Sequence, residues 1–172
     1  LPYTLILSGD HIYRMNYAAM IDYHVENDAD ITIGVVPMPV ETATEFGIVM
    51  AGADRSVVGF QEKPKENPVT MPDDPTKVLV SMGIYVFRTE ALIRHLIEDA
   101  KRKDSSHDFG KDIIPKMVAN GSKVLAYYFK GIEGNSYWRD IGTLDAYYEA
   151  HMDLVSVTPE LNLYDTEWPI WT

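Results

Sequence analysis

The sequence has 172 residues, enough to bury one core of moderate size, so a single domain or a piece of a larger one is expected. With 15 Lys and Arg against 26 Asp and Glu, the net charge of -11 argues against a protein that binds nucleic acid or an anionic membrane surface. The chain has no Cys, which excludes disulfides and thiolate metal sites, and no apolar run approaches the roughly 20 residues of a membrane-spanning helix.

The two ends of the sequence are abrupt. The chain begins at Leu1 directly before an apolar stretch, with no initiator Met, and closes on the aromatic and Pro-containing stretch 167–172. We therefore expect a part of a longer polypeptide. The absence of a visible signal peptide carries little weight for the same reason.

The first predicted element is the apolar run Leu5–Leu7, which stops at Gly9 and is followed at once by Asp10. This pattern is typical of a buried parallel strand that delivers a carboxylate to the C-terminal edge of an open α/β sheet, where such sheets bind ligands. We interpret Asp10 as a metal-binding carboxylate. The alternative is that it only caps the following turn.

The next predicted elements alternate between helix and strand. Asn16 is expected to cap a helix that runs to about Glu26. The nearly continuous apolar run at 29–36 predicts an interior strand, ended by Pro37 and Pro39. Two shorter strands, at 46–50 and 57–61, flank a turn at 52–55 and predict a hairpin.

Beyond the hairpin, four prolines at 64–77 predict a long irregular loop, which more often serves function than packing. The remaining elements, in order, are a strand at 78–87, an amphipathic helix at 92–100, a short helix at 113–119, a strand at 124–129 and a helix that Thr143 caps. In the helix at 92–100 the apolar positions are Leu92, Ile93, Leu96, Ile97 and Ala100. This mixture predicts a three-layer α/β domain.

A second carboxylate, Asp140, falls between the last strand and the last helix, where it would also reach the sheet edge. Gly142, two residues on, permits close approach of a ligand. Two Asp from distant parts of the chain would suit Mg²⁺, which takes few carboxylates and completes its octahedron with water and substrate phosphates. The alternative is that Asp140 pairs with Arg139 or with the helix N-terminus.

Other polar residues lie beside predicted strands and helices. Lys63 follows a strand and precedes a Pro, which suits a point charge for a phosphate monoester, and Glu62 beside it would accept hydrogen bonds from sugar hydroxyls. As an isolated pair, these two are more often a solvated surface. Ser81–Gly83 interrupts an apolar strand, which marks either a ligand or a bulge. Asp108 precedes a helix, as an N-cap or as a sugar-hydroxyl acceptor. His11 and His107 have no partner at zinc-ligand spacing.

Five motifs in order resemble one known family. They are Ser-Gly-Asp-His-Ile-Tyr at 8–13, Phe-Gln-Glu-Lys-Pro at 60–64, Ser-Met-Gly-Ile-Tyr-Val-Phe at 81–87, Ser-Ser-His-Asp-Phe-Gly-Lys-Asp-Ile-Ile-Pro at 105–115 and Tyr-Trp-Arg-Asp-Ile-Gly-Thr at 137–143. Together they are similar to the glucose-1-phosphate adenylyltransferases of the bacterial type, over residues 5–172.

The resemblance implies a Rossmann-like nucleotidyltransferase fold with a mixed, mostly parallel sheet, and an enzyme that joins ATP to α-D-glucose 1-phosphate, releasing pyrophosphate, for glycogen or starch synthesis. It implies that Asp10 and Asp140 hold Mg²⁺ and act in catalysis with Lys63. It further implies a sugar-phosphate site. The residues of that site would be Glu62, Lys63, Ser81, Gly83, Tyr85, Asp108 and Trp138.

The resemblance also sets the expected organisation. The Gly-rich ATP loop of the family lies upstream of the Gly-Asp-His strand and has no match here, so residues 1–157 would be the sugar-phosphate-binding part of the catalytic domain. Residues 158–172 would link it to a β-helix domain. A cytoplasmic homotetramer is implied for the full-length protein. The alternatives are a sugar-1-phosphate nucleotidyltransferase that uses dTTP or UTP, and a non-catalytic regulatory subunit.

Overall fold

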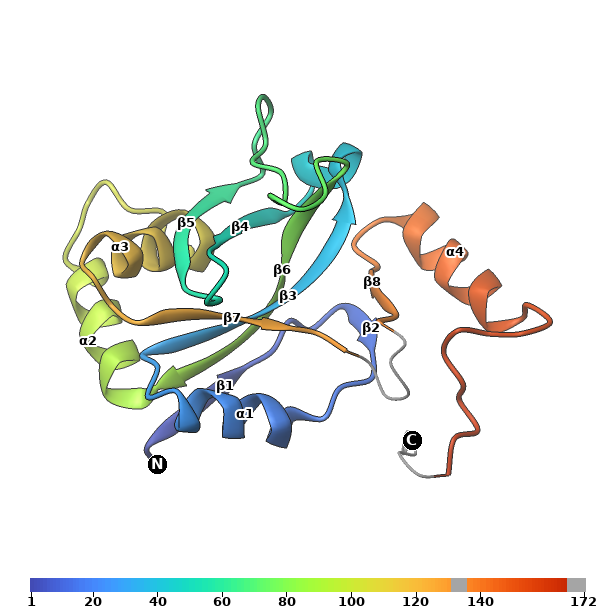
Figure 1. Cartoon of the computed structure of the whole chain (residues 1–172), viewed down its shortest axis with the longest axis horizontal. Coiled ribbons are helices and arrows are strands. Elements are labelled where there is room, and N and C mark those ends of the chain that lie inside the picture. Colours follow the sequence, from blue (N-terminus) through green and yellow to red (C-terminus); the bar gives the residue numbers. More distant parts are fainter. Residues whose placement is uncertain (131–135, 167–172) are drawn as a thin grey trace. The chain divides into compact units, whose positions relative to one another are not determined.

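The computed structural model describes residues 1–130 and 136–166. Its strands are β1 (Tyr3–Ile6), β2 (His11–Tyr13), β3 (Ile31–Pro39), β4 (Gly47–Ala51), β5 (Val57–Glu62), β6 (Lys77–Arg88), β7 (Val124–Tyr128) and β8 (Trp138–Asp140) (Figure 1). Its helices are α1 (Tyr17–Glu26), α2 (Thr89–Ala100), α3 (Ile114–Ala119) and α4 (Leu144–Leu154), with a 3-10 helix η1 (Val40–Thr44) and a π-helix η2 (Phe109–Ile113). None of the helices in these ranges is long and apolar enough to cross a membrane.

The chain divides into two compact units. The large unit consists of residues 1–7 and 18–128, and the small unit of residues 8–17 and 129–172. The chain therefore leaves the large unit after β1, forms β2 in the small unit, and returns to the large unit in α1. The predicted site residues are distributed over both units.

The large unit is built on a six-stranded sheet in the order β5-β4-β6-β3-β7, with β1 also paired to β6. The predicted α/β class and mixed sheet are confirmed. Within the described residues, however, only β3 and β7 pair in parallel, and all the other pairs are antiparallel, so the expectation of a mostly parallel sheet is wrong here. Strand β1, predicted as a buried parallel strand, is half-buried and antiparallel to β6.

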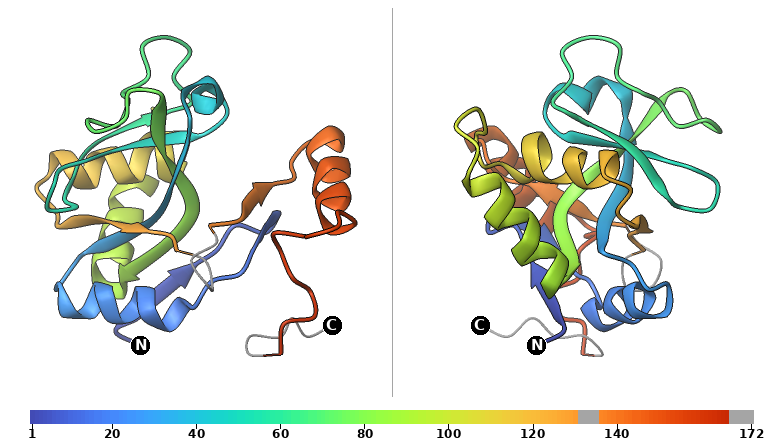
Figure 2. Two further views of the ribbon diagram at one scale, coloured as in Figure 1. Left: turned by 45° about the vertical axis from the view of Figure 1, so that its right-hand side comes forward. Right: turned by 90° about the vertical axis from the view of Figure 1, so that its left-hand side faces the viewer.

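Helices cover both faces of this sheet, which gives three layers (Figure 2). Successive side chains of a strand point to opposite faces. On β3, Ile31 and Ile33 belong to the core that also contains residues of α2, η2 and α3. Thr32, between them, accepts or donates a 2.8 Å hydrogen bond with Nδ1 of His24 on α1. Helix α1 therefore lies on the opposite face from α2 and α3.

Strand β3 continues through Pro37 and Pro39, which were expected to end it. Both prolines are still paired in register with β6. The other neighbour of β3, strand β7, pairs with it only as far as Val35. Beyond that residue β3 is an edge strand, and an edge tolerates residues that lack an N–H donor.

Helix α2 is confirmed, but its buried face differs from the apolar positions in the sequence. Ile93, Leu96 and Ile97 have exposed side chains. The residues that the helix buries are Ala91, Leu92, His95 and Asp99. Apolar periodicity identified the helix without identifying the side that packs on the sheet.

The small unit has a two-stranded antiparallel sheet and one described helix. Strands β2 and β8 pair so that His11 lies opposite Asp140. Thr143 caps α4 as predicted, its Oγ1 accepting a 3.1 Å hydrogen bond from Ala146 N. A 2.6 Å ion pair between Arg14 and Asp165 joins the segment after α4 to the residue that follows β2.

Candidate functional site

The two predicted metal-binding carboxylates come together in the small unit. One ligand atom each from Asp10, His11 and Asp140 can be chosen so that all three lie within 4.8 Å of one another. Pairing of β2 with β8 produces this arrangement, because it sets His11 opposite Asp140. A separate two-stranded sheet therefore brings Asp10 close to Asp140. The sequence had suggested that both would lie at the edge of the main sheet.

Backbone and hydroxyl groups fix both carboxylates. Asp140 Oδ1 accepts a 2.9 Å hydrogen bond from Gly142 N, and Asp10 Oδ1 accepts a 3.0 Å hydrogen bond from Ser8 Oγ. A Cβ atom at position 142 would lie 3.2 Å from Asp140 Oδ1 and 3.9 Å from Asp10 Oδ2, so the glycine leaves room beside both side chains. The alternative partners considered for Asp140 were Arg139 and the N-terminus of the next helix. Arg139 is instead paired with Asp153, and Gly142 lies ahead of α4.

His11 is the member of this cluster that the sequence reasoning passed over. Its Nε2 lies 3.6 Å from Asp10 Oδ1, 4.0 Å from Asp140 Oδ1 and 3.2 Å from Ser8 Oγ. Its ring stands edge-on to the buried ring of Trp138, with centroids 5.1 Å apart. Only the pairing of β2 with β8 places His11 next to Asp140. Strands of three residues leave no periodic pattern in the sequence, so this pairing could not be predicted.

The donor set fits Mg²⁺. Two carboxylates from separate segments, with side chains 61% and 32% exposed for Asp10 and Asp140, leave open directions for water and phosphate oxygens. Imidazole is a ligand for softer ions such as zinc, and a magnesium site is built from oxygen. His11 therefore suits a neighbour of the ion better than a ligand to it.

In the large unit, Glu62 and Lys63 follow each other at the end of β5 but differ in environment. Glu62 is half-buried, whereas Lys63 is exposed and has a left-handed backbone with φ of 46°. Burial raises the pKa of the Glu62 carboxyl, and the nearby Asp108 charge raises it further. Gly110 touches the Glu62 carboxylate so closely that a Cβ atom there would collide with Oε2.

Asp108 begins η2 directly beside this carboxylate. Its Oδ1 accepts hydrogen bonds from Gly110 N at 2.8 Å and from Lys111 N at 2.9 Å, so the predicted N-cap role is confirmed. Its side chain is exposed. Among the described residues no group donates a hydrogen bond to the other oxygen, Oδ2, so capping leaves one acceptor available for a ligand.

The interruption of β6 at Ser81–Gly83 is a bulge. The pairing of β3 with β6 shifts there: Ile33 pairs with Tyr85, but Val35 pairs with Ser81. Gly83 has φ of 66°, a conformation that favours glycine. The bulge sets Ser81 Oγ 3.4 Å from Tyr85 OH. Tyr85 packs against the ring of Phe109, the residue after Asp108, and Glu62 lies against Gly110, so these side chains gather around the start of η2. Burial raises the pKa of Tyr85, and the charges of Glu62 and Asp108 raise it further.

The sequence model of the nucleotidyl transferase family matches residues 2–157. The chain belongs to this family. Curated relatives agree over nearly the whole chain. Glucose-1-phosphate adenylyltransferase 2 of Pseudoalteromonas atlantica is 52% identical over 172 residues, covering 99% of this chain and 40% of the relative. Glucose-1-phosphate adenylyltransferase 1 of Alkalilimnicola ehrlichii is 51% identical, with the same coverage. The enzyme of Nitrosomonas europaea is 48% identical over 175 residues, again 99% of this chain and 40% of the relative.

The nucleotidyl transferase chain thus spans about two fifths of the length of these relatives. Its predicted site residues fall into two groups. Glu62, Ser81, Tyr85 and Asp108 lie together in the large unit with Lys63 next in sequence to Glu62, and Asp10 and Asp140 lie together in the small unit. Trp138 belongs to the second group, where its ring packs against His11.

Proposed function

We propose that this chain is part of a glucose-1-phosphate adenylyltransferase, which transfers the adenylyl group of ATP to α-D-glucose 1-phosphate and releases pyrophosphate. The observation that carries the proposal is the meeting of Asp10 and Asp140, which come from distant parts of the sequence. The names of relatives about half identical to the chain support the choice of substrates.

In the proposed mechanism Asp10 and Asp140 hold Mg²⁺. The ion, when bound, neutralises charge on the phosphates of ATP. His11, between Trp138 and the two carboxylates, keeps their oxygens oriented through contacts of 3.6 and 4.0 Å. A phosphate oxygen of the sugar phosphate is the attacking group, so the protein needs no nucleophile of its own.

The large-unit residues would bind the sugar phosphate. Lys63 is exposed and supplies a positive point charge for the phosphate. Glu62 and Asp108 Oδ2, the oxygen that does not cap η2, accept hydrogen bonds from sugar hydroxyls. Ser81 and Tyr85 lie beside them. Gly83 lets the sugar approach the bulged backbone. Trp138 is proposed as a further sugar-binding residue on family resemblance alone.

The same resemblance extends the proposal to the organisation of the protein. Residues 1–157 would form the sugar-phosphate-binding part of the catalytic domain, and residues 158–172 a connection to a further domain. In the described part of that connection, Leu161 is buried and Asp165 is paired with Arg14. The full-length protein would be a cytoplasmic homotetramer.

A nucleotide panel on the full-length protein tests the substrates. We expect ADP-glucose from ATP and glucose 1-phosphate, dependent on added Mg²⁺. Preference for dTTP or UTP would replace the adenylyl assignment with another sugar nucleotide. Failure to form any nucleotide sugar would favour a regulatory subunit.

Substitution of the first carboxylate tests the site itself. We expect Asp10→Asn in the full-length protein to lower kcat by about 10²-fold or more, because the neutral amide no longer holds the ion that stabilises the developing charge. Asp22→Asn, an exposed position on α1, is the matched control and should leave kcat unchanged. Unchanged turnover in Asp10→Asn would contradict the proposed role.

A further inference from the structure

Asp99 is a buried carboxylate that the candidate site does not yet use. It lies in the last turn of α2 and is only 2% exposed. The C-terminal end of a helix is its negative end, so a carboxylate there gains nothing from the helix dipole. A buried charge needs hydrogen-bonding partners, and those of Asp99 come from the loop that follows α2.

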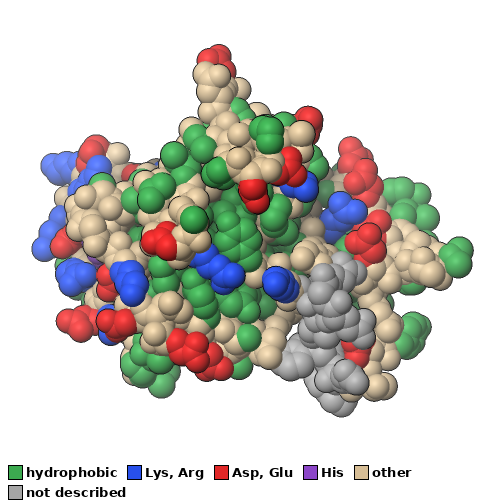
Figure 3. All heavy atoms as spheres, viewed as in Figure 1, with side chains coloured by type: hydrophobic (Ala, Val, Ile, Leu, Met, Phe, Trp, Pro, Cys, Tyr) green, Lys and Arg blue, Asp and Glu red, His purple; other side chains and the backbone are tan. Residues whose placement is uncertain are grey.

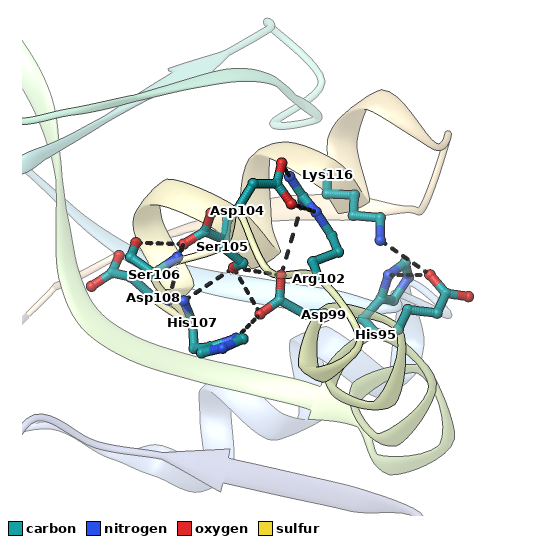
Figure 4. Close-up of polar contacts among 11 residues, drawn as sticks. His95, Asp99, Arg102, Asp104, Ser105, Ser106, His107, Asp108 and Lys116 are labelled. Atoms are coloured by element: carbon teal, nitrogen blue, oxygen red, sulfur yellow. Dashed lines mark hydrogen bonds and ion pairs between the residues drawn. The ribbon is translucent and has the colours of Figure 1, made fainter.

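That loop and Asp99 form a closed set of hydrogen bonds (Figure 4). Ser105 Oγ lies 2.8 Å from Asp99 Oδ1 and 3.0 Å from Oδ2, and it accepts a 3.0 Å hydrogen bond from His107 N. The ring of His107 lies with Nδ1 2.7 Å from Asp99 Oδ2, and Arg102 Nη1 lies 4.0 Å from Asp99 Oδ1. A carboxylate can only accept, so the contact with His107 requires the proton on Nδ1. The same bond keeps the pKa of Asp99 below its usual value.

The set holds His107 in an uncommon backbone conformation. Its φ is +58°, in the left-handed region that a non-glycine residue adopts only when its surroundings impose it. The bonds from both the ring and the N–H of His107 supply that constraint. The next residue in the chain is Asp108, so the constraint acts on the backbone from which its side chain projects.

From the other side, Asp112 on η2 fixes the same loop. Its Oδ2 accepts hydrogen bonds from Ser106 N at 3.1 Å and from Asp108 N at 3.2 Å. Asp112 thus holds the backbone N–H of Asp108 directly, and Asp99 holds His107, the residue before it. Asp108 Oδ1 accepts hydrogen bonds from the first turn of η2. The direction of Asp108 Oδ2 therefore depends on the backbone conformation that these contacts fix.

We infer that Asp99 is a positioning residue for the sugar-phosphate site, acting through Ser105 and His107 to aim the free oxygen of Asp108 at a hydroxyl of the sugar. This inference rests on the proposed function, which makes Asp108 a sugar ligand. It assigns to Asp99 an effect on sugar-phosphate binding and none on ATP or on the chemical step.

The test is a double-mutant cycle in the full-length protein. Asp99→Asn should raise KM for glucose 1-phosphate by about tenfold, as the loss of one hydrogen bond to a charged group predicts. We expect kcat and KM for ATP to stay within about twofold of wild type, because the change removes only binding of the sugar. Lys103→Gln, at an exposed position in the same loop, is the control and should change neither KM.

Coupling distinguishes positioning from simple destabilisation. In an Asp108→Ala background, Asp99→Asn should raise KM for glucose 1-phosphate no further, because the oxygen that it aims is gone. An equal rise in both backgrounds would overturn the inference. If Asp99→Asn does not fold, His107→Gln carries the same cycle, because the side chain of His107 is 57% exposed and its Nδ1 contacts Asp99.

The outcomes also separate this inference from the proposed function. A wild-type protein that makes ADP-glucose, an Asp108→Ala variant with raised KM for glucose 1-phosphate, and an Asp99→Asn variant with normal KM would leave the function intact and overturn the role of Asp99. A raised KM in Asp108→Ala and Asp99→Asn, with faster amide hydrogen exchange confined to residues 104–110, would support it. An Asp108→Ala variant with normal KM would refute Asp108 as the ligand, and the role of Asp99 with it.

Discussion

The large and small units support their candidate site residues by different means. In the large unit, Glu62 ends a strand of a six-stranded sheet, and Asp108 caps a helix that packs into the main core. In the small unit, Asp10 and Asp140 depend on two strands of three residues each. A two-stranded pairing is marginal without further support, so the candidate metal residues have less structure behind them than the candidate sugar residues.

Both units expose large apolar side chains, but they differ in the apolar core that they bury. Helix α4 exposes several large apolar side chains, visible on the face shown in Figure 3. These are Leu144, Tyr147, Tyr148, Met152 and Val155. The large unit exposes Ile93, Leu96 and Ile97 of α2 but also buries a continuous cluster of strand and helix residues. We therefore expect the candidate sugar residues to rest on a more stable unit than the candidate metal residues.

The largest effect should come from the core of the large unit. Phe87 is fully buried and packs against the rings of Tyr85 and Phe109, so Phe87→Ala should lower the free energy of unfolding of that unit by about 3 to 5 kcal/mol. Amide hydrogen exchange resolved by residue range would show faster exchange in residues 18–128. Val58→Ala, on a 66% exposed side chain, is the control. Equal acceleration in residues 136–166 would show that the two units unfold together.

An intermediate effect should come from the ion pair of the small unit. Both side chains of the Arg14–Asp165 pair are only 10% exposed, and Arg14 also donates a 2.9 Å hydrogen bond to Asn162 O. Arg14→Ala should therefore release residues 158–166, with a loss of about 2 kcal/mol in their local opening free energy. Hydrogen exchange of that segment measures the loss.

Arg88→Ala supplies the contrast in the large unit. Arg88 pairs with Asp28, whose side chain is 86% exposed, and solvent weakens such a pair. Arg88→Ala should therefore change the local opening free energy around residues 28 and 88 very little. A segment 158–166 that exchanges at the wild-type rate in Arg14→Ala would show that the ion pair contributes nothing to the small unit.

The fold was predictable where a pattern is local. Alternating and continuous apolar runs located the β4–β5 hairpin, β6 and β7, and the apolar spacing located α2. The pattern did not say which side of α2 is buried, because Ile93 and Ile97 are as apolar as Leu92 and only the docked sheet selects between them. It also did not foresee that β7 stops short of Pro37, which is what lets β3 run on.

The site was predictable in its residue types but not in its construction. A Gly beside each of Asp10 and Asp140 marked them as candidates, yet the pairing of β2 with β8 that joins them spans three residues on each side. His11 and Asp99 were missed for a related reason. Each acts through partners that are distant in sequence or outside any periodic pattern, so their environment exists only in the folded chain.

The smallest effect concerns the charge of Glu62. Burial and the neighbouring Asp108 raise the pKa of Glu62 above its ordinary 4.5, so the carboxyl binds a proton more readily in the folded chain than in the unfolded one. Because folding raises this pKa, the carboxyl adds to the free energy of unfolding below pH 4.5. That contribution is lost as the pH rises through the folded-state pKa. Gln resembles the protonated carboxyl, so Glu62→Gln should be more stable than wild type at pH 7.

Urea unfolding at two pH values measures this difference. The stability gain of Glu62→Gln should be present at pH 7 and disappear at about pH 4, where the wild-type carboxyl is itself protonated. Glu66→Gln, in the exposed loop after β5, should give no such pH dependence. The same variant should bind glucose 1-phosphate more weakly, because an amide replaces the carboxylate acceptor, so stability and binding change in opposite directions. A Glu62→Gln variant that is equally destabilised at both pH values would contradict this. It would show that favourable contacts stabilise the carboxylate and that its burial does not cost stability.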